Sequence, residues 1–433
     1  MDEATRLLLA ALDDPRALGR RRVVAFSGGM DSTCLLHALA GLARARDRSD
    51  RLRAIHVHHG LQAQAEEWTR HCAAICAQLG VPLELSWVQV ERDNGQGLEG
   101  AARQARYAAF EKVLKPGDVL LMAHHLDDQA ETFLLRALRA SGPDGLAAMP
   151  DWRRLGAGWL WRPWLAQPRA RIADYAARHR LEWIEDDSNV DISLDRNFLR
   201  HRVLPLLQQR WPQAAAALAR SAQLSAQAAD LLASEDAGAL AAAGDGEGNL
   251  RVDALLALPA ARRARVLRRW IGEHALPPLP ARGIEQLQKV LHARDDLRAS
   301  FAWSGACVRR WRERLHAGPQ REPLPADWQA QWDGREPLLL PGGGMLALHG
   351  AERFESPLLA RARAGGERIV LPGRLHSHAL KHLLQEQGVP PWLRERLPLL
   401  WRDGELLAAG DRIVSATLQQ WLDAQGARLA WEP

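Results

Sequence analysis

The chain has 433 residues, which exceeds one ordinary hydrophobic core and predicts two or three domains. Its formal net charge is +5, and almost all of its basic charge is arginine. The arginine guanidinium group binds phosphate in a bidentate manner and stacks on bases, so this composition favours an anionic partner such as nucleic acid. A GC-rich genome would produce the same arginine excess, and composition alone leaves the two explanations open.

Cysteine usage and hydropathy exclude several classes of protein. The cysteines Cys34, Cys72, Cys76 and Cys307 form no CxxC pair, which argues against a disulfide framework and against the usual zinc or iron–sulfur sites. The first residues are acidic with a short apolar run, unlike a secretory signal, and no stretch reaches the roughly 20 apolar residues of a membrane span. We expect a cytoplasmic protein with no membrane partner.

Short apolar runs alternate with helical patterns over the first two hundred residues. Strict alternation of strand and helix predicts an α/β domain with a doubly wound parallel sheet. The predicted strands cover residues 22–26, 52–58, 82–88 and 118–124, and the predicted helices cover 33–43, 65–79 and 98–114. Polar loops at 27–32, 58–62 and 124–131 follow three of the strands, at the edge where ligands of such sheets bind.

The pattern changes after Pro205. Long segments rich in Ala, Leu and Arg predict helices without strands, interrupted by a loop at 236–249, and a Pro-rich linker follows at 316–327. Beyond it we expect a small mixed α/β domain with a hairpin turning at Asp403 and Gly404. The predicted domains are a catalytic α/β domain at 1–210, a helical domain at 211–318 and the small C-terminal domain at 328–433.

The loop after the first predicted strand reads SGGMDS. Its two glycines let backbone N–H groups turn inward to cradle phosphate at a helix N-terminus, and Ser27 and Ser32 add hydroxyl donors. Asp31 would repel phosphate unless it acted through a cation, which predicts a Mg²⁺ ligand. Neither GxxxxGK[ST] nor GxGxxG surrounds this loop, which argues against a Walker loop and a dinucleotide fold.

Acidic residues gather after the fourth predicted strand, in HHLDDQAET. A helix beginning near Asp127 places Asp127 and Asp128 within one turn of Glu131, where they could hold a cation or an ammonium group. Acids are also ordinary helix starters, and the two histidines leave a metal site as a further alternative. Arg103, Arg106 and Tyr107 share a predicted helix face, and a polar loop leads to Arg196, Asn197, Arg200 and Arg202.

Six motifs in this order resemble the tRNA(Ile)-lysidine synthetase family of the PP-loop ATP pyrophosphatase superfamily. They are SGGMDS, HHGLQ, EGAARQARY, HHLDDQAET, RASGPDGLAAM and DRNFLR, and they span most of residues 22–205. The stretch at 380–401 resembles the C-terminal domain of the long, three-domain members. The resemblance implies a ligase that uses ATP and Mg²⁺ to join free L-lysine to the wobble cytidine of a tRNA(Ile) with a CAU anticodon, through an adenylated cytidine. It leaves the oligomeric state open, with a homodimer as one option.

The resemblance also implies roles for individual residues. The ATP cradle would be Ser27, Gly28, Gly29, Met30, Asp31 and Ser32, with Asp31 as the metal ligand. Asp128 and Glu131 would hold the lysine ammonium, and Arg103, Arg106, Arg196 and Arg200 would contact the tRNA. The implied catalytic set is Asp31, Asp127, Asp128, Glu131, Arg103 and Arg106. For His124 and His125, proton transfer and loop shaping stay open.

The later domains would grip tRNA. Candidate phosphate contacts are Arg262, Arg263, Arg265, Arg268 and Arg269, or else Arg309, Arg310, Arg312 and Arg314 near Trp303 and Trp311, with a solvated arginine face as the alternative for each residue. In the tail, the candidates for reading the acceptor stem are Lys381, His382, Trp392, Arg394 and Arg396. Two alternatives remain: another PP-loop tRNA-modifying enzyme such as a tRNA thiolase, and a non-catalytic tRNA-binding protein.

Overall fold

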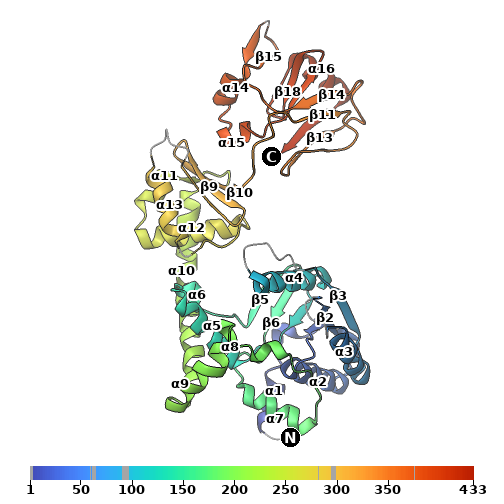
Figure 1. Ribbon diagram of the computed structural model, residues 1–433, viewed down its shortest axis with the longest axis vertical. Helices are drawn as coiled ribbons and strands as arrows, with labels where there is room; N and C mark the ends of the chain where they lie inside the picture. The colour runs from blue at the N-terminus through green and yellow to red at the C-terminus, as the bar shows by residue number, and fades with distance from the viewer. Residues whose placement is uncertain are drawn as a thin grey trace. The chain divides into compact units, whose positions relative to one another are not determined.

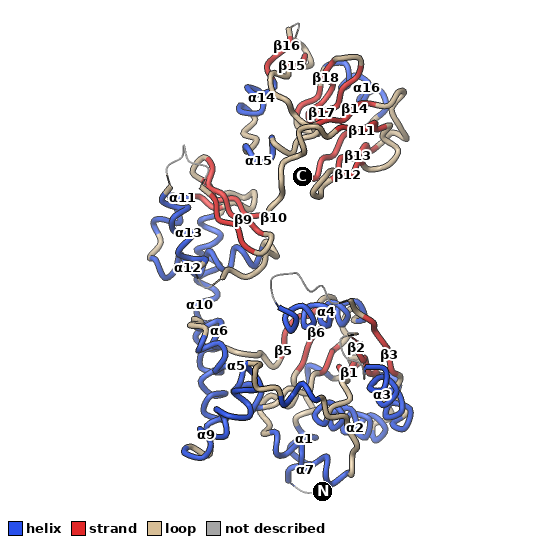
Figure 2. The backbone as a smooth tube through the Cα atoms, viewed as in Figure 1, coloured by secondary structure: helices blue, strands red, loops and turns tan. Residues whose placement is uncertain are grey.

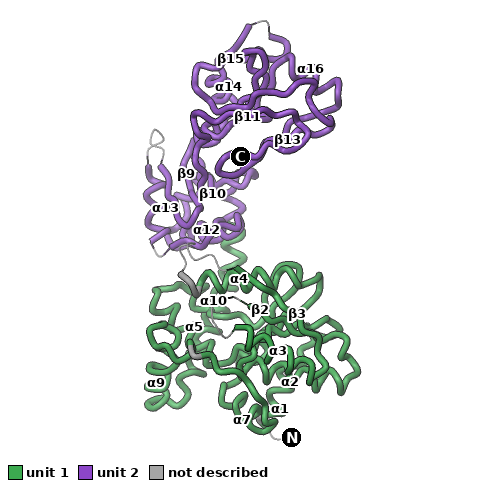
Figure 3. Tube along the Cα trace, turned by 45° about the vertical axis from the view of Figure 1, so that its right-hand side comes forward, with its two compact units in different colours: residues 1–239 green, residues 240–433 purple. Residues whose placement is uncertain are grey.

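The computed structural model describes residues 3–58, 60, 65–89, 97–280, 282–293, 299–374 and 376–433. It divides into two compact units, residues 1–239 and 240–433 (Figure 3). Most of the HHGLQ motif lies outside the described residues.

A six-stranded sheet organises the first unit (Figure 1). Its order is β3-β2-β1-β4-β6-β5, and all neighbours pair in parallel except β5 and β6. The strands are β1 Arg22–Ala25, β2 Leu52–His58, β3 Leu83–Trp87, β4 Val119–Leu121, β5 Trp152–Leu155 and β6 Gly158–Trp161. The doubly wound parallel sheet was correctly predicted, whereas the β5–β6 hairpin was missed.

Helices cover both faces of this sheet because its buried strands are apolar on both sides. Val24 packs with residues of α2, α3 and α7, whereas its neighbour Val23 packs with Phe110 and Leu114 at the end of α4. The helices are α1 Glu3–Ala10, α2 Met30–Ala45, α3 Ala65–Leu79, α4 Gly97–Val113 and α7 Arg169–His179. The predicted helices therefore exist, and α2 begins three residues earlier than expected, inside the SGGMDS loop.

The strand order reverses between β1 and β4, because β2 and β3 lie on one side of β1 while β4 and β6 lie on the other. At such a switch point the loops after the two central strands diverge and leave a crevice at their carboxyl ends. The SGGMDS loop follows β1, and His124–Glu131 follows β4. Topology thus brings together two motifs separated by almost one hundred residues.

A helical extension completes the first unit. It contains α5 Leu126–Leu138, α6 Pro143–Leu146, α8 Asp195–Phe198, a π-helical turn at Leu199–Val203, α9 Leu204–Arg210 and the long α10 Ala214–Ala243. Pro205 has no N–H to donate to the preceding turn, which fits the irregular winding before it. Because α10 continues to Ala243, the predicted loop beginning at 236 was wrong in its first half.

The second unit begins with helices α11 Val252–Ala257, α12 Ala260–Glu273 and α13 Gly283–His292. They accompany a four-stranded sheet of β7 Leu250–Arg251, β10 Arg314–Pro319, β9 Ala306–Trp311 and β8 Ser300–Trp303 (Figure 2). The region is helical as predicted, but the expectation that it lacks strands was wrong. Strand β10 also takes in residues 316–319, which had been assigned to a linker.

The rest of the second unit is mixed, as expected. Its strands are β11 Gln329–Trp332, β12 Leu338–Leu339, β13 Met345–His349, β14 Leu358–Arg361, β15 Arg368–Val370, β16 Ser377–Ala379, β17 Leu399–Arg402, β18 Glu405–Ala409, β19 Ile413–Val414 and β20 Arg428–Glu432. Its helices are α14 Leu380–Glu386, α15 Pro391–Arg394 and α16 Ala416–Gln425. The hairpin at Asp403 and Gly404 joins β17 to β18 as predicted. Among the described helices none is long and apolar enough to cross a membrane.

The turn after β1 requires glycine at position 28. Gly28 has φ +85°, and a Cβ there would lie 2.9 Å from the Sγ of buried Cys72. We expect Gly28→Ala to lower the free energy of unfolding of the first unit by about 1–3 kcal/mol, measured by chemical denaturation. Gly41→Ala is the control, since a Cβ at this α2 position meets nothing within 4 Å and should stabilise the helix slightly. Equal effects of the two substitutions would contradict the prediction.

Candidate active site

The SGGMDS loop is held by its own hydroxyl groups. The Ser27 and Ser32 hydroxyl oxygens lie 3.1 Å apart, and the Ser32 hydroxyl donates to the Gly29 carbonyl at 3.0 Å. Ile184 N–H donates to the Gly28 carbonyl at 3.0 Å, which ties the loop to the segment after α7. The loop is therefore built before any ligand binds, and it stands at the N-terminus of α2, where the helix dipole favours an anion.

Asp31 lies in the first turn of α2 and points toward the loop after β4. Its Oδ2 is 3.8 Å from His125 Nε2 and 3.7 Å from Arg169 Nε, while its buried Oδ1 has no hydrogen-bond partner. Burial raises the pKa of Asp31, against the opposing effect of His125 and Arg169. An unpartnered buried carboxylate oxygen beside an anion cradle fits a divalent cation. Within the described ranges no three His, Cys, Asp or Glu residues gather to hold a metal, so phosphate oxygens or water would complete its shell.

His125 caps helix α5 and faces three carboxylates. Its backbone N–H donates to Asp128 Oδ2 at 3.0 Å, and its Nδ1 accepts from Asp128 N–H at 3.3 Å, which forms a capping box. Its ring also lies within 4 Å of Asp31, Asp127 and Asp128. Burial lowers the pKa of His125, but the carboxylates outweigh burial and raise it. In the imidazolium form Nδ1 carries a proton and can no longer accept the hydrogen bond from the Asp128 N–H. The positive charge of the ring would then compensate the negative charge of the acids.

Glu131 is the most deeply buried acid of the site, with no exposed surface. Arg196 Nε donates to its Oε2 at 2.8 Å, and Arg200 donates to its two carboxylate oxygens at 2.7 and 3.0 Å. Both guanidinium groups also reach Asp128 Oδ1, at 3.2 Å from Arg196 and 3.0 Å from Arg200. The predicted carboxylates and two of the predicted arginines therefore form one ion-pair cluster that joins α5 to the segment of α8 and the π-helical turn.

This cluster sets the charge state of Asp128. Burial raises the pKa of its carboxyl, but His125 and the two arginines outweigh burial and lower the pKa to about 2. Asp128 is therefore ionised at neutral pH. The pKa of Asp127 is also lowered, against burial, by His125 and by the Arg169 backbone N–H, which donates to its Oδ2 at 2.9 Å.

His124 differs from His125 although the two are adjacent. Burial lowers the pKa of His124 to about 3, so its ring is neutral. Arg162 Nε donates to His124 Nδ1 at 3.1 Å, which leaves the ring proton on Nε2. Arg162 is itself buried and donates to the Pro150 carbonyl at 2.7 Å. The arginine thus fixes both the orientation and the tautomer of the imidazole.

The predicted arginines of α4 lie farther from the acids. Arg103 is exposed, with its guanidinium 5.0 Å from the Tyr107 ring centroid and its Nη2 3.4 Å from the Tyr107 hydroxyl. Its charge contributes to lowering the pKa of half-buried His124. Arg106 is half-buried on the same helix.

Sequence reasoning missed two arginines of the site, Arg162 and Arg169. Arg162 directly follows β6, at the same edge of the sheet as the other functional loops. A prediction that included the β5–β6 hairpin would have marked Arg162 as a site residue, because ligands of such sheets bind at the carboxyl ends of the strands. Arg169 begins α7 and approaches Asp31 and Asp127 only through the tertiary fold, and no local pattern marks it.

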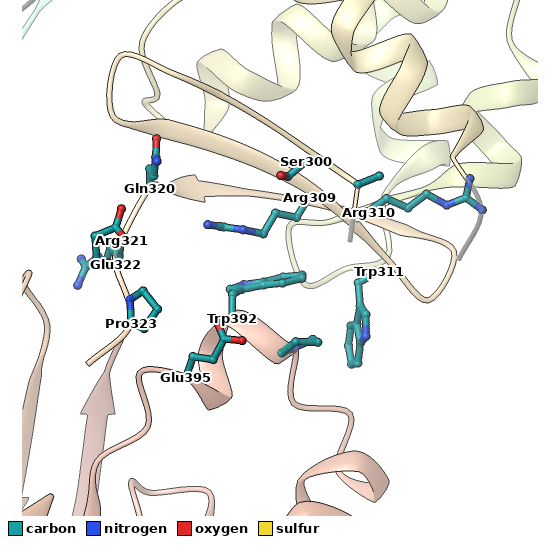
Figure 4. Close-up of a pocket in the computed structure, with 12 residues that line it drawn as sticks. Ser300, Arg309, Arg310, Trp311, Gln320, Arg321, Glu322, Pro323, Trp392 and Glu395 are labelled. Carbon is teal, nitrogen blue, oxygen red and sulfur yellow. The ribbon is translucent and has the colours of Figure 1, made fainter. Parts of the chain in front are cut away.

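The second unit contains a cavity of about 300 Å³ beside β9 and α15 (Figure 4). The Arg309 guanidinium lies over the Trp392 ring at 5.3 Å from its centroid, and Trp311 and His316 contact the edges of the same ring system. A second cavity of about 250 Å³ shares Arg309, Arg321 and Trp392 in its wall. This pairing of arginine with aromatic rings is typical of surfaces that stack nucleic-acid bases.

Three family models match the chain: a PP-loop domain at residues 3–207, a TilS substrate binding domain at 250–316 and a TilS substrate C-terminal domain at 358–431. Among solved structures, the U34-tRNA thiolase NcsA from Methanococcus maripaludis matches with a TM-score of 0.39 and 16% identity, over 51% of this chain and 77% of that chain.

Curated relatives match over nearly the whole length. The tRNA(Ile)-lysidine synthase of Xanthomonas axonopodis pv. citri is 57% identical, covering 94% of this chain and 93% of the relative. The proteins of the same name from Xanthomonas campestris pv. campestris and Xylella fastidiosa (strain Temecula1) are 55% and 52% identical, with at least 94% of each chain covered. The chain therefore belongs to the tRNA(Ile)-lysidine synthase family.

Proposed function

We propose that this protein uses ATP to ligate free L-lysine to the wobble cytidine of a tRNA(Ile) with a CAU anticodon. Family membership supports this function, and one observation of the structure supports the roles that we propose for particular residues. The SGGMDS loop with Asp31 and the ionised Asp128 converge at the β1/β4 switch point, which supports an anion site and an ammonium site next to each other.

The cradle would bind the phosphates of ATP through the inward-turned backbone and the Ser27 and Ser32 hydroxyls. Asp31 would hold Mg²⁺, which would neutralise charge as pyrophosphate leaves. The cytidine carbonyl oxygen would attack the α-phosphate, and the lysine ε-amine would then displace AMP from the adenylated carbon. Neutral His124 presents Nε2–H as a hydrogen-bond donor, a role we propose near the reacting base.

The ammonium site would use Asp128 and Glu131. Two guanidinium groups already compensate these carboxylates, so a lysine ammonium must share Asp128 with them or displace one of them. Asp128 is the more accessible of the two acids, since its side chain is 11% exposed and that of Glu131 is fully covered. We therefore propose that Asp128 contacts the lysine ammonium directly. Glu131 would hold Arg196 and Arg200 in place until one of them moves.

The tRNA would be held by both units. Arg103 and Arg106 would contact the cytidine or its flanking phosphates, and Arg309, Arg321 and Trp392 would hold the body of the tRNA. We propose a catalytic domain at 1–210, a helical domain at 211–318 and a C-terminal domain at 328–433. Sulfur transfer is disfavoured as the alternative reaction, because burial raises the thiol pKa of Cys34 and Cys72 to about 12 and of Cys76 to about 11.

The central test combines purified protein, ATP, labelled lysine and tRNA(Ile) bearing CAU. We expect label transfer to this tRNA, and none in the absence of ATP. We further expect Asp31→Asn to reduce tRNA-dependent pyrophosphate release by about 10²–10³-fold, because the metal-linked charge is lost, while tRNA affinity is retained. The control is Asp174→Asn, an exposed acid of α7. A lack of transfer by the wild-type protein would refute the proposed function.

Asp128→Asn separates adenylation from lysine transfer. The amide keeps an acceptor for the His125 N–H but removes the charge that an ammonium needs, so we expect the KM for lysine to rise at least about tenfold. Pyrophosphate release should continue at a rate near that of the wild type. Steady-state assays over a lysine series would measure both, with Asp174→Asn again as control. An unchanged KM for lysine would exclude Asp128 as the ammonium ligand.

The Arg309–Trp392 surface predicts a base-stacking contribution to tRNA affinity. We expect Trp392→Leu to weaken binding of tRNA by about 5- to 100-fold, the range for loss of one stacked base. The control is Trp211→Leu, whose ring is 58% exposed in the first unit. Filter-binding titrations would measure the dissociation constants. Equal affinities for the two variants would remove Trp392 from the tRNA-binding surface.

A further inference from the structure

A small cavity lies at the edge of the first unit's sheet opposite to the active site. It borders the first residues of β1 and β2, Arg22 and Leu52, whereas the SGGMDS loop follows the other end of β1. Its volume is about 40 Å³, enough for two or three water molecules or for one tetrahedral oxyanion. Five arginines line this arginine pocket: Arg20, Arg22, Arg46, Arg48 and Arg51.

Backbone carbonyl groups fix two of these arginines in place. Arg51 Nη1 donates to the Gly19 carbonyl at 2.5 Å, and Arg20 donates to the Arg16 carbonyl at 2.7 Å and the Gly117 carbonyl at 3.2 Å. These bonds orient the guanidinium groups without cancelling their charge. The pocket is therefore a formed structure with several N–H donors already held at its wall.

Positive charge is in excess at this pocket. Asp13 forms an ion pair with Arg46 at 2.9 Å, and among the described residues none that lines the cavity is acidic. Burial lowers the pKa of Arg22, and the neighbouring Arg46 and Arg48 lower it further against the effect of Asp13. The C-terminal carbonyl groups of α2 supply only about half a negative charge. The lining of the pocket thus contributes five guanidinium groups, of which Arg46 is paired with a carboxylate.

We propose that the arginine pocket binds one phosphate group. A tetrahedral oxyanion fits the volume, accepts hydrogen bonds from several guanidinium forks and carries the charge that the cluster lacks. A nucleobase is too large for this cavity. The phosphate comes either from the phosphodiester backbone of bound RNA or from free inorganic phosphate, and the RNA source alone rests on the proposed function.

The free-phosphate arm compares the full-length protein with Arg22→Gln/Arg48→Gln and with the control Arg44→Gln, an exposed arginine of α2 outside the pocket. Inorganic phosphate should raise the melting temperature of the wild type and the control by a few degrees over chloride at equal ionic strength. The double variant should show a smaller rise. Phosphate binding at the SGGMDS loop is common to all three proteins, so only the difference between them counts.

The RNA arm measures tRNA affinity against salt concentration for the same three proteins. If the pocket holds a tRNA phosphodiester, the double variant should lose about one unit of the slope of log K against log salt. A lost phosphate response with an unchanged slope assigns the pocket to free phosphate. The proposal is overturned if the double variant keeps both the wild-type phosphate response and the wild-type slope. Its affinity for ATP, measured in parallel, reports that the first unit is folded.

Lysine transfer by the wild-type protein is scored separately. Failure of that assay refutes the proposed function and leaves the free-phosphate arm standing. If the wild-type enzyme transfers lysine and the double variant matches it in both the phosphate response and the salt slope, only the pocket is refuted.

Discussion

Glu131 is a fully buried carboxylate, and the arrangement of the site depends on its neutralisation by Arg196 and Arg200. A buried charge without a partner costs several kcal/mol, so at least one positively charged group must stay beside Glu131. They come from a segment more than sixty residues downstream, and their binding to Glu131 and Asp128 draws that segment over the start of α5. The π-helical turn at Leu199–Val203, which contains Arg200, lies where α8 passes into α9. Irregular turns of this kind are often found at functional sites.

The same cluster gives the proposed two-step reaction its electrostatic layout. Asp31 adjoins the proposed phosphate cradle and has an unpartnered oxygen for the proposed cation, whereas Asp128 is ionised, as the proposed ammonium site requires. His125 lies between them, with its ring within 4 Å of Asp31 and Asp128, and couples the two halves. His124 stays neutral because burial and Arg162 act on it in the same direction. Two adjacent histidines thus have opposite charge preferences for reasons that only their surroundings explain.

Predictions from the sequence succeeded where the signal was local. The strands at Leu52–His58 and elsewhere, the helix at Ala65–Leu79 and the hairpin at Asp403 and Gly404 follow from apolar runs, helical spacing and turn residues. Prediction failed for short strands between turns, such as β5, β6 and β8–β10, where four to six residues carry too little periodicity to stand out. Because β6 was not predicted, Arg162 was not recognised as a residue at the carboxyl end of a strand, and it was left out of the predicted site.

The SGGMDS turn, the parallel sheet and the convergence of two motifs on one edge follow from the amino-acid order alone, because strand–helix alternation and right-handed connections leave few topologies. The amino-acid order also supplied the residue types from which the family follows. Four features became visible only in three dimensions: the pairing of the acids with Arg196 and Arg200, the approach of Arg169 to Asp31, the position of Arg309 over Trp392, and the five arginines around one small cavity. These contacts join side chains far apart in the chain, and their pairing depends on burial and charge compensation in three dimensions, which no local pattern encodes.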